Sequence, residues 1–251
     1  MKYRRLPYHE YFVNTSEDYN HTGRQTYKIE YKAVPYKCAG WERVFCPSHE
    51  VNYEMHYEPE RDVIQLNFQC THGGSDWFAN VFEFSSKYYE AITFEDAPLQ
   101  LRVHHGWGEM YRAVKHEVRD GWLSLIKLHP KAHTEIIGWS LGSGLAILCC
   151  QDLNYNFGLK SYLYTFGSVR PFKHTLRNKE KTLKYLSTLT KKCLNFADVN
   201  DIITYMPPFR GFTAIRRVNV GGDERRTLTR LLKPLKYHTH YDRPDLYYKI
   251  I

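Results

Sequence analysis

The sequence predicts one α/β domain, with a mostly parallel central sheet flanked by helices. Two observations lead to this fold class. Residues 134–139 form a β-branched run that leads through a Gly-x-Ser-x-Gly segment into an apolar, helix-forming run ending near residue 148. Other short apolar runs, separated by helix-compatible stretches, lie on both sides of it, and such alternation around a buried strand is typical of α/β domains. The 251 residues are enough for one sizeable core, with residues 1–50 as an N-terminal decoration.

The segments before the central strand read as a hairpin, a loop and a helix. Residues 51–57 and 63–68 flank the turn cluster Glu-Pro-Glu-Arg-Asp, which predicts two paired strands. A Gly-rich loop follows at 71–77, and a helix is expected from about Glu109. Its apolar positions recur at helical spacing: Met110, Val114, Val118, Trp122 and Leu125. Residues 27–34 alternate enough for a strand or a helix edge, and the pattern leaves both open.

The second half of the chain continues the alternation. Residues 161–167 predict a strand, 173–192 a basic helical stretch on the outside, and 193–196 a short strand. Residues 215–220 predict one more strand before a last short helix headed by Pro244.

Charge and cysteine usage limit the partners and the compartment. The formal net charge of +8 favours acidic partners, and an anionic membrane surface fits as a peripheral contact. No nucleic-acid-binding motif accompanies the scattered Lys and Arg residues, so no nucleic-acid partner is expected. Six cysteines lack metal-ligand spacing, and the sequence contains neither a secretory signal nor a membrane-spanning run. Reduced cysteines and a cytoplasmic location are therefore expected.

The segment around Ser140 has the composition of a nucleophile elbow, a tight turn between a strand and a helix. Gly138 and Gly142 remove side chains where the backbone passes close on either side. Ser140 is then expected at the tip, with the positive end of the helix behind it. The amide of Leu141 would point at an oxyanion formed during attack.

Two further residue types complete the chemistry that such a serine needs. Ser140, Asp201 and His238 occur in the order serine, aspartate, histidine, each at or beyond an expected strand end. Histidine takes the serine proton, and the carboxylate fixes the imidazole tautomer. Asp198, three residues before Asp201, remains an alternative carboxylate. His240 remains an alternative base, because periodicity does not separate the two imidazoles; His238 is preferred for its spacing to Tyr241.

Six short motifs occur in one order between residues 51 and 245. They are Phe-Gln-Cys-Thr with Asp-Trp (68–77), Val-His-His-Gly-Trp (103–107), Gly-Trp-Ser-Leu-Gly (138–142), Thr-Phe-Gly-Ser-Val-Arg (165–170), Asn-Asp-Ile-Ile with Pro-Pro (200–208) and His-Thr-His-Tyr (238–241). Together they resemble the motifs of the fungal-type, class-three lipase family of the α/β-hydrolase superfamily. The resemblance implies the α/β-hydrolase fold.

The resemblance also implies roles for individual residues. Ser140 corresponds to the nucleophile, Asp201 to the orienting carboxylate and His238 to the base, while Thr71 and Leu141 correspond to the oxyanion donors. The implied activity is hydrolysis of lipid esters, acylglycerol or glycerophospholipid, through an acyl-enzyme. No metal and no cofactor is implied.

The sequence departs from the family pattern near the implied site. Trp139 replaces the usual histidine of the elbow, Ser143 replaces a glycine, and Gln69-Cys70 replaces Arg-Gly before the oxyanion residue. No reacting group is lost. The altered elbow and loop keep a second hypothesis open, a catalytically inactive, hydrolase-like binding module.

Overall fold

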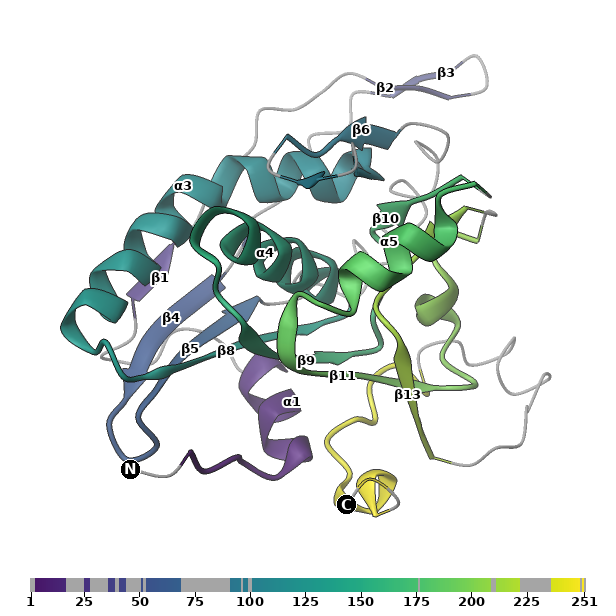
Figure 1. Ribbon diagram of the computed structural model, residues 1–251. Coiled ribbons are helices and arrows are strands. Elements are labelled where there is room, and N and C mark those ends of the chain that lie inside the picture. Colours follow the sequence, from purple (N-terminus) through teal and green to yellow (C-terminus); the bar gives the residue numbers. More distant parts are fainter. Residues whose placement is uncertain are drawn as a thin grey trace.

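A seven-stranded, mostly parallel sheet forms the centre of the computed structural model (Figure 1). The model describes residues 3–16, 25–27, 36–38, 41–43, 51, 53–68, 91–95, 97–98, 101–175, 177–208, 211–221, 236–248 and 250. Within these, the strand order is β1 (Gln25–Tyr27), β4 (Tyr53–Glu58), β5 (Val63–Phe68), β8 (His133–Trp139), β9 (Ser161–Phe166), β11 (Thr190–Asp198) and β13 (Arg217–Val220).

Strand directions confirm the predicted α/β class. From β5 to β13 every neighbouring pair is parallel, whereas β1, β4 and β5 pair antiparallel at one edge. Tyr53 lies opposite Phe68 in the β4–β5 pair, as the predicted hairpin requires. Parallel strands place their carboxyl ends at one edge, and the loops carrying Ser140 and Asp201 leave from that edge.

Helices cover both faces of the sheet (Figure 1). On one face lie α3 (His105–Leu128), α4 (Leu141–Phe157) and α5 (Lys179–Leu186); on the other lie α1 (Tyr8–Ser16) and the 3₁₀ helix η3 (Pro244–Tyr247). The first thirteen residues of α4 are all buried, which explains their nearly continuous apolar composition. No helix in the described part of the chain is long and apolar enough to cross a membrane.

The face under α1 is largely aromatic. Tyr8 and Phe12 of α1 pack against Phe166 and Phe196 of the sheet, and Phe12 also approaches the buried Tyr241 near the C-terminus. In Figure 1 the purple N-terminal helix and the yellow C-terminal segment accordingly lie on the same side. The first and last parts of the chain therefore close one core together.

Smaller elements surround the carboxyl edge. A second sheet has the order β12 (Phe212–Thr213), β10 (Phe172–Lys173), β7 (Arg102–His104) and β6 (Ala91–Thr93). A separate pair joins β2 (Tyr36–Cys38) to β3 (Trp41–Arg43), and the 3₁₀ helix η2 (Ile202–Tyr205) follows Asp201. The predicted loop at 71–77 and residues 28–34 lie outside the described residues.

Helix α3 begins at His105, so the predicted start near Glu109 is wrong. Gly106 and Gly108 in the first turn have low helix propensity, so local composition does not indicate a helix there. A Cβ at Gly108 would lie 2.6 Å from Ile92 Cδ1 and 2.8 Å from Val103 Cγ2, so a larger residue would require these side chains to shift.

Three other boundaries also differ from the sequence prediction. The basic stretch at 173–192 includes the last residue of β10 and the start of β11, and only eight of its residues form α5. Pairing with β9 extends β11 to nine residues, three of which precede the predicted strand. The last predicted strand begins at Arg217 rather than at residue 215. Contacts between strands, which local composition does not encode, decide these limits.

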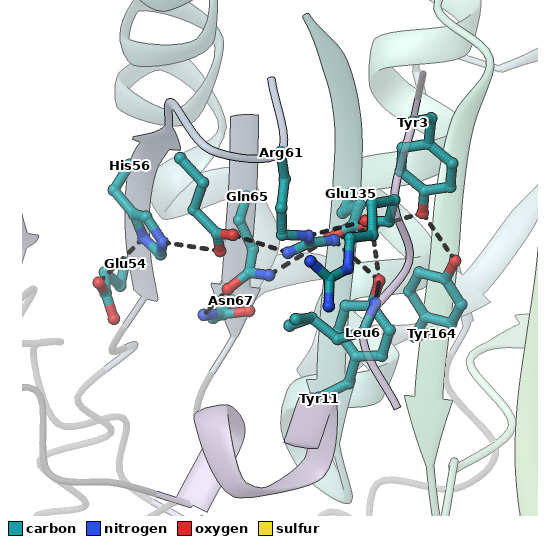
Figure 2. A network of polar contacts seen from close by, with 12 residues as sticks. Tyr3, Leu6, Tyr11, Glu54, His56, Arg61, Gln65, Asn67, Glu135 and Tyr164 are labelled. Carbon is teal, nitrogen blue, oxygen red and sulfur yellow. Dashed lines mark hydrogen bonds and ion pairs between the residues drawn. The ribbon is translucent and has the colours of Figure 1, made fainter. Parts of the chain in front are cut away.

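A buried polar cluster occupies the α1 face of β4, β5 and β8, centred on Glu135 (Figure 2). Arg61 Nη2 and the Tyr11 hydroxyl each donate to Glu135 Oε1 at 2.6 Å, and the Tyr3 hydroxyl donates to the same oxygen. Gln65 Nε2 donates to Oε2 at 3.3 Å. Burial, together with the negative charge of Glu135, raises the pKa of both tyrosines. The cluster therefore links the N-terminal segment to the central strand.

Candidate active site

Ser140 occupies the turn between β8 and α4, and its backbone is in a region that L-residues rarely adopt (φ 54°, ψ −120°). Its amide donates to Phe166 O at 3.0 Å, which holds the turn against the end of β9. A Cβ at Gly138 would lie 2.5 Å from Gly142 O, so the strand can meet the helix this closely only without that side chain. The structure thus has the elbow that the two glycines predict.

Ser143 stabilises the turn from inside the helix. Its amide donates to Ser140 O at 3.1 Å, its hydroxyl donates to the same oxygen, and Val169 N donates to Ser143 Oγ at 3.3 Å. Serine at this position therefore joins α4 to the loop after β9, a bond that a glycine side chain cannot make.

Leu141, the predicted oxyanion donor, is the first residue of α4. The first amides of a helix have no carbonyl partner within it and carry the positive end of its dipole. A 17-residue helix beginning directly after Ser140 therefore favours negative charge beside the serine. The other predicted donor, Thr71, lies outside the described residues.

Asp201 and His238 form a buried carboxylate–imidazole pair. His238 Nδ1 lies 2.8 Å from Asp201 Oδ2, and both side chains are almost fully buried. The other carboxylate oxygen, Oδ1, accepts from Ile203 N at 2.9 Å, which fixes the side chain at the start of η2. A carboxylate on Nδ1 selects the tautomer in which Nε2 accepts a proton.

The elbow and this pair meet at the end of β9. Phe166 O accepts from Ser140 N, and a Cβ on the next residue, Gly167, would lie 2.7 Å from both Asp201 Oδ2 and His238 Cε1. Gly167 also has a positive φ of 54°, so glycine is required there on two counts. Ser140 Oγ is buried and makes no hydrogen bond to any described residue.

Trp139, one of the residues that depart from the motif of the resembled family, contacts the segment that carries His238. Its Nε1 donates to His238 O at 3.0 Å, and its ring lies 5.4 Å from the imidazole ring. The substitution therefore supports the backbone that carries His238.

The two alternatives from the sequence, Asp198 and His240, pair with each other. His240 Nε2 lies 3.3 Å from Asp198 Oδ2, whereas Asp201 binds His238. Tyr241 connects the two pairs: its hydroxyl donates to Asp201 Oδ2 at 2.8 Å and accepts from Asp198 N at 3.1 Å. Sequence spacing singled out Tyr241 only as a landmark, and no local signal reveals its bond to Asp201.

No group of three or more His, Cys, Asp or Glu side chains suited to a metal ion occurs among the described residues. Cys149 and Cys150 are buried in α4 and Cys193 is partly buried in β11, all three as free thiols. Burial raises the pKa of the Cys150 thiol to about 12, which leaves it protonated and unreactive. Ser140 at the elbow is therefore better suited to nucleophilic chemistry than these three thiols.

A family model described as lipase (class 3) matches residues 65–211, more than half of the chain. The chain belongs to the class 3 lipase family. The matched residues include most of β5, the elbow and Asp201, while His238 lies beyond them. No curated protein matches the chain.

Solved lipase structures share the fold of this class 3 lipase family member. One is a triacylglycerol lipase described as having a serine-protease triad at its catalytic centre, with 21% identity, a TM-score of 0.59, and coverage of 69% of this chain and 63% of that one. The triacylglyceride lipase of Rhizomucor miehei has 18% identity, a TM-score of 0.58, and coverage of 79% and 68%. A mutant form of MDLA from Penicillium cyclopium has 14% identity, a TM-score of 0.61, and coverage of 87% and 79%.

These likenesses establish an α/β-hydrolase-type fold of the kind found in lipases. This chain spans less than two thirds of the length of the first of the three structures.

Proposed function

We propose that this protein is a serine carboxylic-ester hydrolase that acts on lipid esters. The observation that carries the proposal is the strained Ser140, which lies at the same strand edge as the buried Asp201–His238 pair. Membership of the class 3 lipase family supports it, as does the fold shared with a triacylglycerol lipase described as having such a triad. Strained backbone at a functional serine is a known way of presenting a nucleophile.

In the proposed reaction, Ser140 Oγ attacks the ester carbonyl carbon and its proton passes to His238 Nε2. The tetrahedral oxyanion is stabilised by the amides of Leu141 and Thr71. As the C–O bond to the alcohol breaks, the imidazolium gives its proton to the leaving oxygen and an acyl-enzyme remains. Water then attacks this ester by the same route and releases the carboxylic acid.

Asp201 contributes to both steps without taking the proton. Its negative charge, 2.8 Å from Nδ1, stabilises the imidazolium that forms when Ser140 is deprotonated. The Tyr241 hydroxyl and Ile203 N hold the carboxylate in this orientation. Neither a metal nor a cofactor enters the reaction.

For the substrate, we propose a long-chain ester at a lipid surface, either acylglycerol or glycerophospholipid. The net charge of +8 favours glycerophospholipid, because a basic protein accumulates at an anionic interface. The cytoplasmic location stays a prediction from cysteine usage.

The test is hydrolysis of p-nitrophenyl esters of increasing chain length, and of a phospholipid, by the wild type and Ser140→Ala. Because triad members act as a unit, Ser140→Ala should lower kcat by about 10⁶-fold while the circular dichroism spectrum stays unchanged. Ser124→Ala is the matched control, since Ser124 is exposed on α3. Wild-type rates in Ser140→Ala would refute the proposal, and a folded wild type inactive on every ester would favour the binding-module hypothesis.

A further inference from the structure

A cavity of about 570 Å³ lies between α5 and the segment running from β12 to β13. One part of its wall is apolar and comes from Leu183 and Leu186 of α5 together with Phe212 and Ile215. The rest carries three arginines, Arg170, Arg216 and Arg217. We call this cavity the arginine groove. Its size and mixed lining are typical of small-molecule sites, which are mostly apolar with a few placed polar groups.

Two arginines of the groove contact the same aromatic ring and form no ion pair with a carboxylate of the described residues. The guanidinium carbons of Arg170 and Arg217 lie 5.3 Å and 4.9 Å from the centre of the same Tyr205 ring. Within the described residues, no carboxylate forms an ion pair with the half-buried Arg170 and Arg217 or with the exposed Arg216. Tyr205 provides only the weaker attraction of a ring face for a cation.

Partial burial disfavours the charged forms of Arg170 and Arg217 when no anion is bound. Burial lowers the pKa of Arg170, and burial together with the nearby Arg170 charge lowers the pKa of Arg217. Both directions mean that the surroundings disfavour the charged forms of these two guanidinium groups. An oxyanion between them would offset both the lost hydration and the repulsion, and the guanidinium fork fits a carboxylate or a phosphate with two parallel bonds.

We propose that the arginine groove binds a single-chain anionic lipid, with its oxyanion on Arg170 and Arg217 and its chain against the apolar wall. A purely ionic ligand would leave the apolar wall uncovered. A neutral ligand would leave the two guanidinium groups without a counterion. A carboxylate and a phosphate monoester share the chemistry that the site recognises.

The groove is separate from the triad but electrostatically close to it. Arg217 interacts with the negative charge of Asp201, and Arg170 is the third residue after Gly167, whose Cα lies against the triad pair. If the proposed esterase function holds, the fatty acid released from Ser140 belongs to the ligand class of the groove. Binding itself does not depend on that function.

The test is equilibrium binding, by isothermal titration calorimetry, to the Ser140→Ala protein, in which hydrolysis plays no part. The four probes are laurate, dodecyl phosphate, dodecanol and inorganic phosphate, which separate the headgroup from the chain. Laurate and dodecyl phosphate should each bind about 10- to 100-fold more tightly than dodecanol and than inorganic phosphate. Dodecanol binding as tightly as laurate would overturn the proposal.

Arginine variants in the same Ser140→Ala background locate the binding. Arg217→Gln and, independently, Arg170→Gln should weaken laurate binding about 10- to 100-fold, and Arg217→Lys should be intermediate because it keeps the charge and loses the fork. Arg243→Gln is the matched control, since it removes an exposed arginine that pairs with Asp245 far along the chain. Wild-type affinity in both glutamine variants would contradict the proposal even if laurate binds elsewhere.

These measurements distinguish a failure of the groove proposal from a failure of the proposed esterase function. Loss of laurate binding in Arg217→Gln, with an inactive but folded wild type, supports the groove and refutes the esterase. An active wild type with unchanged laurate binding in the two glutamine variants supports the esterase and refutes the groove.

Discussion

Strand β8 has a buried polar cluster at each end, and the two clusters differ in how fully their central side chains are hydrogen-bonded. At the amino-terminal end, Glu135 accepts hydrogen bonds from Arg61, Gln65, Tyr11 and Tyr3. At the carboxyl end, Ser140 has a strained backbone, and its hydroxyl makes no hydrogen bond to a described residue. A satisfied cluster stabilises a fold, whereas an unsatisfied one keeps a group available for a reaction.

We therefore expect changes in the two clusters to affect different measured quantities. Changes around Ser140 should alter the rate of ester hydrolysis and leave the free energy of unfolding nearly unchanged. Changes around Glu135 should do the reverse, because no group of that cluster reaches the elbow.

His238→Ala should have the largest effect, a fall in kcat of about 10⁶-fold on a soluble ester, because Ser140 then lacks a base. His240→Ala is the matched control, since His240 binds Asp198, and its kcat should stay within a few-fold of wild type. The measurement is kcat at saturating p-nitrophenyl ester. A severe loss in His240→Ala with a mild one in His238→Ala would exchange the roles of the two imidazoles.

Asp201→Asn should lower kcat by about 10⁴-fold, because the amide favours the wrong imidazole tautomer while the geometry is kept. Asp198→Asn removes the neighbouring carboxylate and should have a much smaller effect on the same rate. Thermal unfolding of both variants checks that the fold is intact. If Asp198→Asn is the more damaging, the orienting carboxylate has been misassigned.

Glu135→Gln should leave kcat within a few-fold of wild type and lower the free energy of unfolding by about 3 kcal/mol. The cost arises because Arg61, almost fully buried, loses the carboxylate 2.6 Å from its Nη2. Urea denaturation followed by tryptophan fluorescence measures the loss. An inactive variant of unchanged stability would mean that the Glu135 cluster belongs to the catalytic machinery.

His56, at the edge of the Glu135 cluster, should give stability a pH dependence. Burial alone would lower its pKa, but Glu54 at 3.0 Å and Glu58 at 3.3 Å raise it from 6.5 to about 8. A raised pKa means that the stabilisation is complete below pH 6.5 and is lost as the pH rises through about 8. The change should be about 2 kcal/mol.

Urea midpoints of wild type and His56→Gln between pH 6 and pH 9 measure this effect. The difference in unfolding free energy between the two proteins should shrink as the pH rises. A difference that is constant across this range would show that the imidazolium is not stabilised by its two carboxylates.

The sequence predicted those parts of the site where backbone geometry permits few residue types. Gly138 and Gly142 marked the elbow because strand and helix backbones nearly touch there, and serine at its tip has a distinctive chemistry. The strand and helix on either side followed from periodicity and apolar composition. The pairing of Asp201 with His238 was also predicted, although the sequence left Asp198 as an alternative carboxylate and His240 as an alternative base.

Features that depend on long-range contacts could not be read in the same way. The bond of Tyr241 to Asp201 and the position of Arg217 near Arg170 join segments that are far apart in the chain. The first turn of α3, where Gly108 packs against Ile92, likewise lies before the predicted start of that helix. Local patterns carry no record of such contacts, so the arginine groove and the start of α3 emerged only from the structure.

The most direct test of the central claim is the reaction of Ser140 with a fluorophosphonate probe, measured by intact-mass spectrometry. Activation of one serine by the buried His238–Asp201 pair predicts a single adduct per chain on wild type, none on Ser140→Ala, and an undiminished adduct on Glu135→Gln. No adduct on the folded wild type, or an equal one on Ser140→Ala, would contradict it.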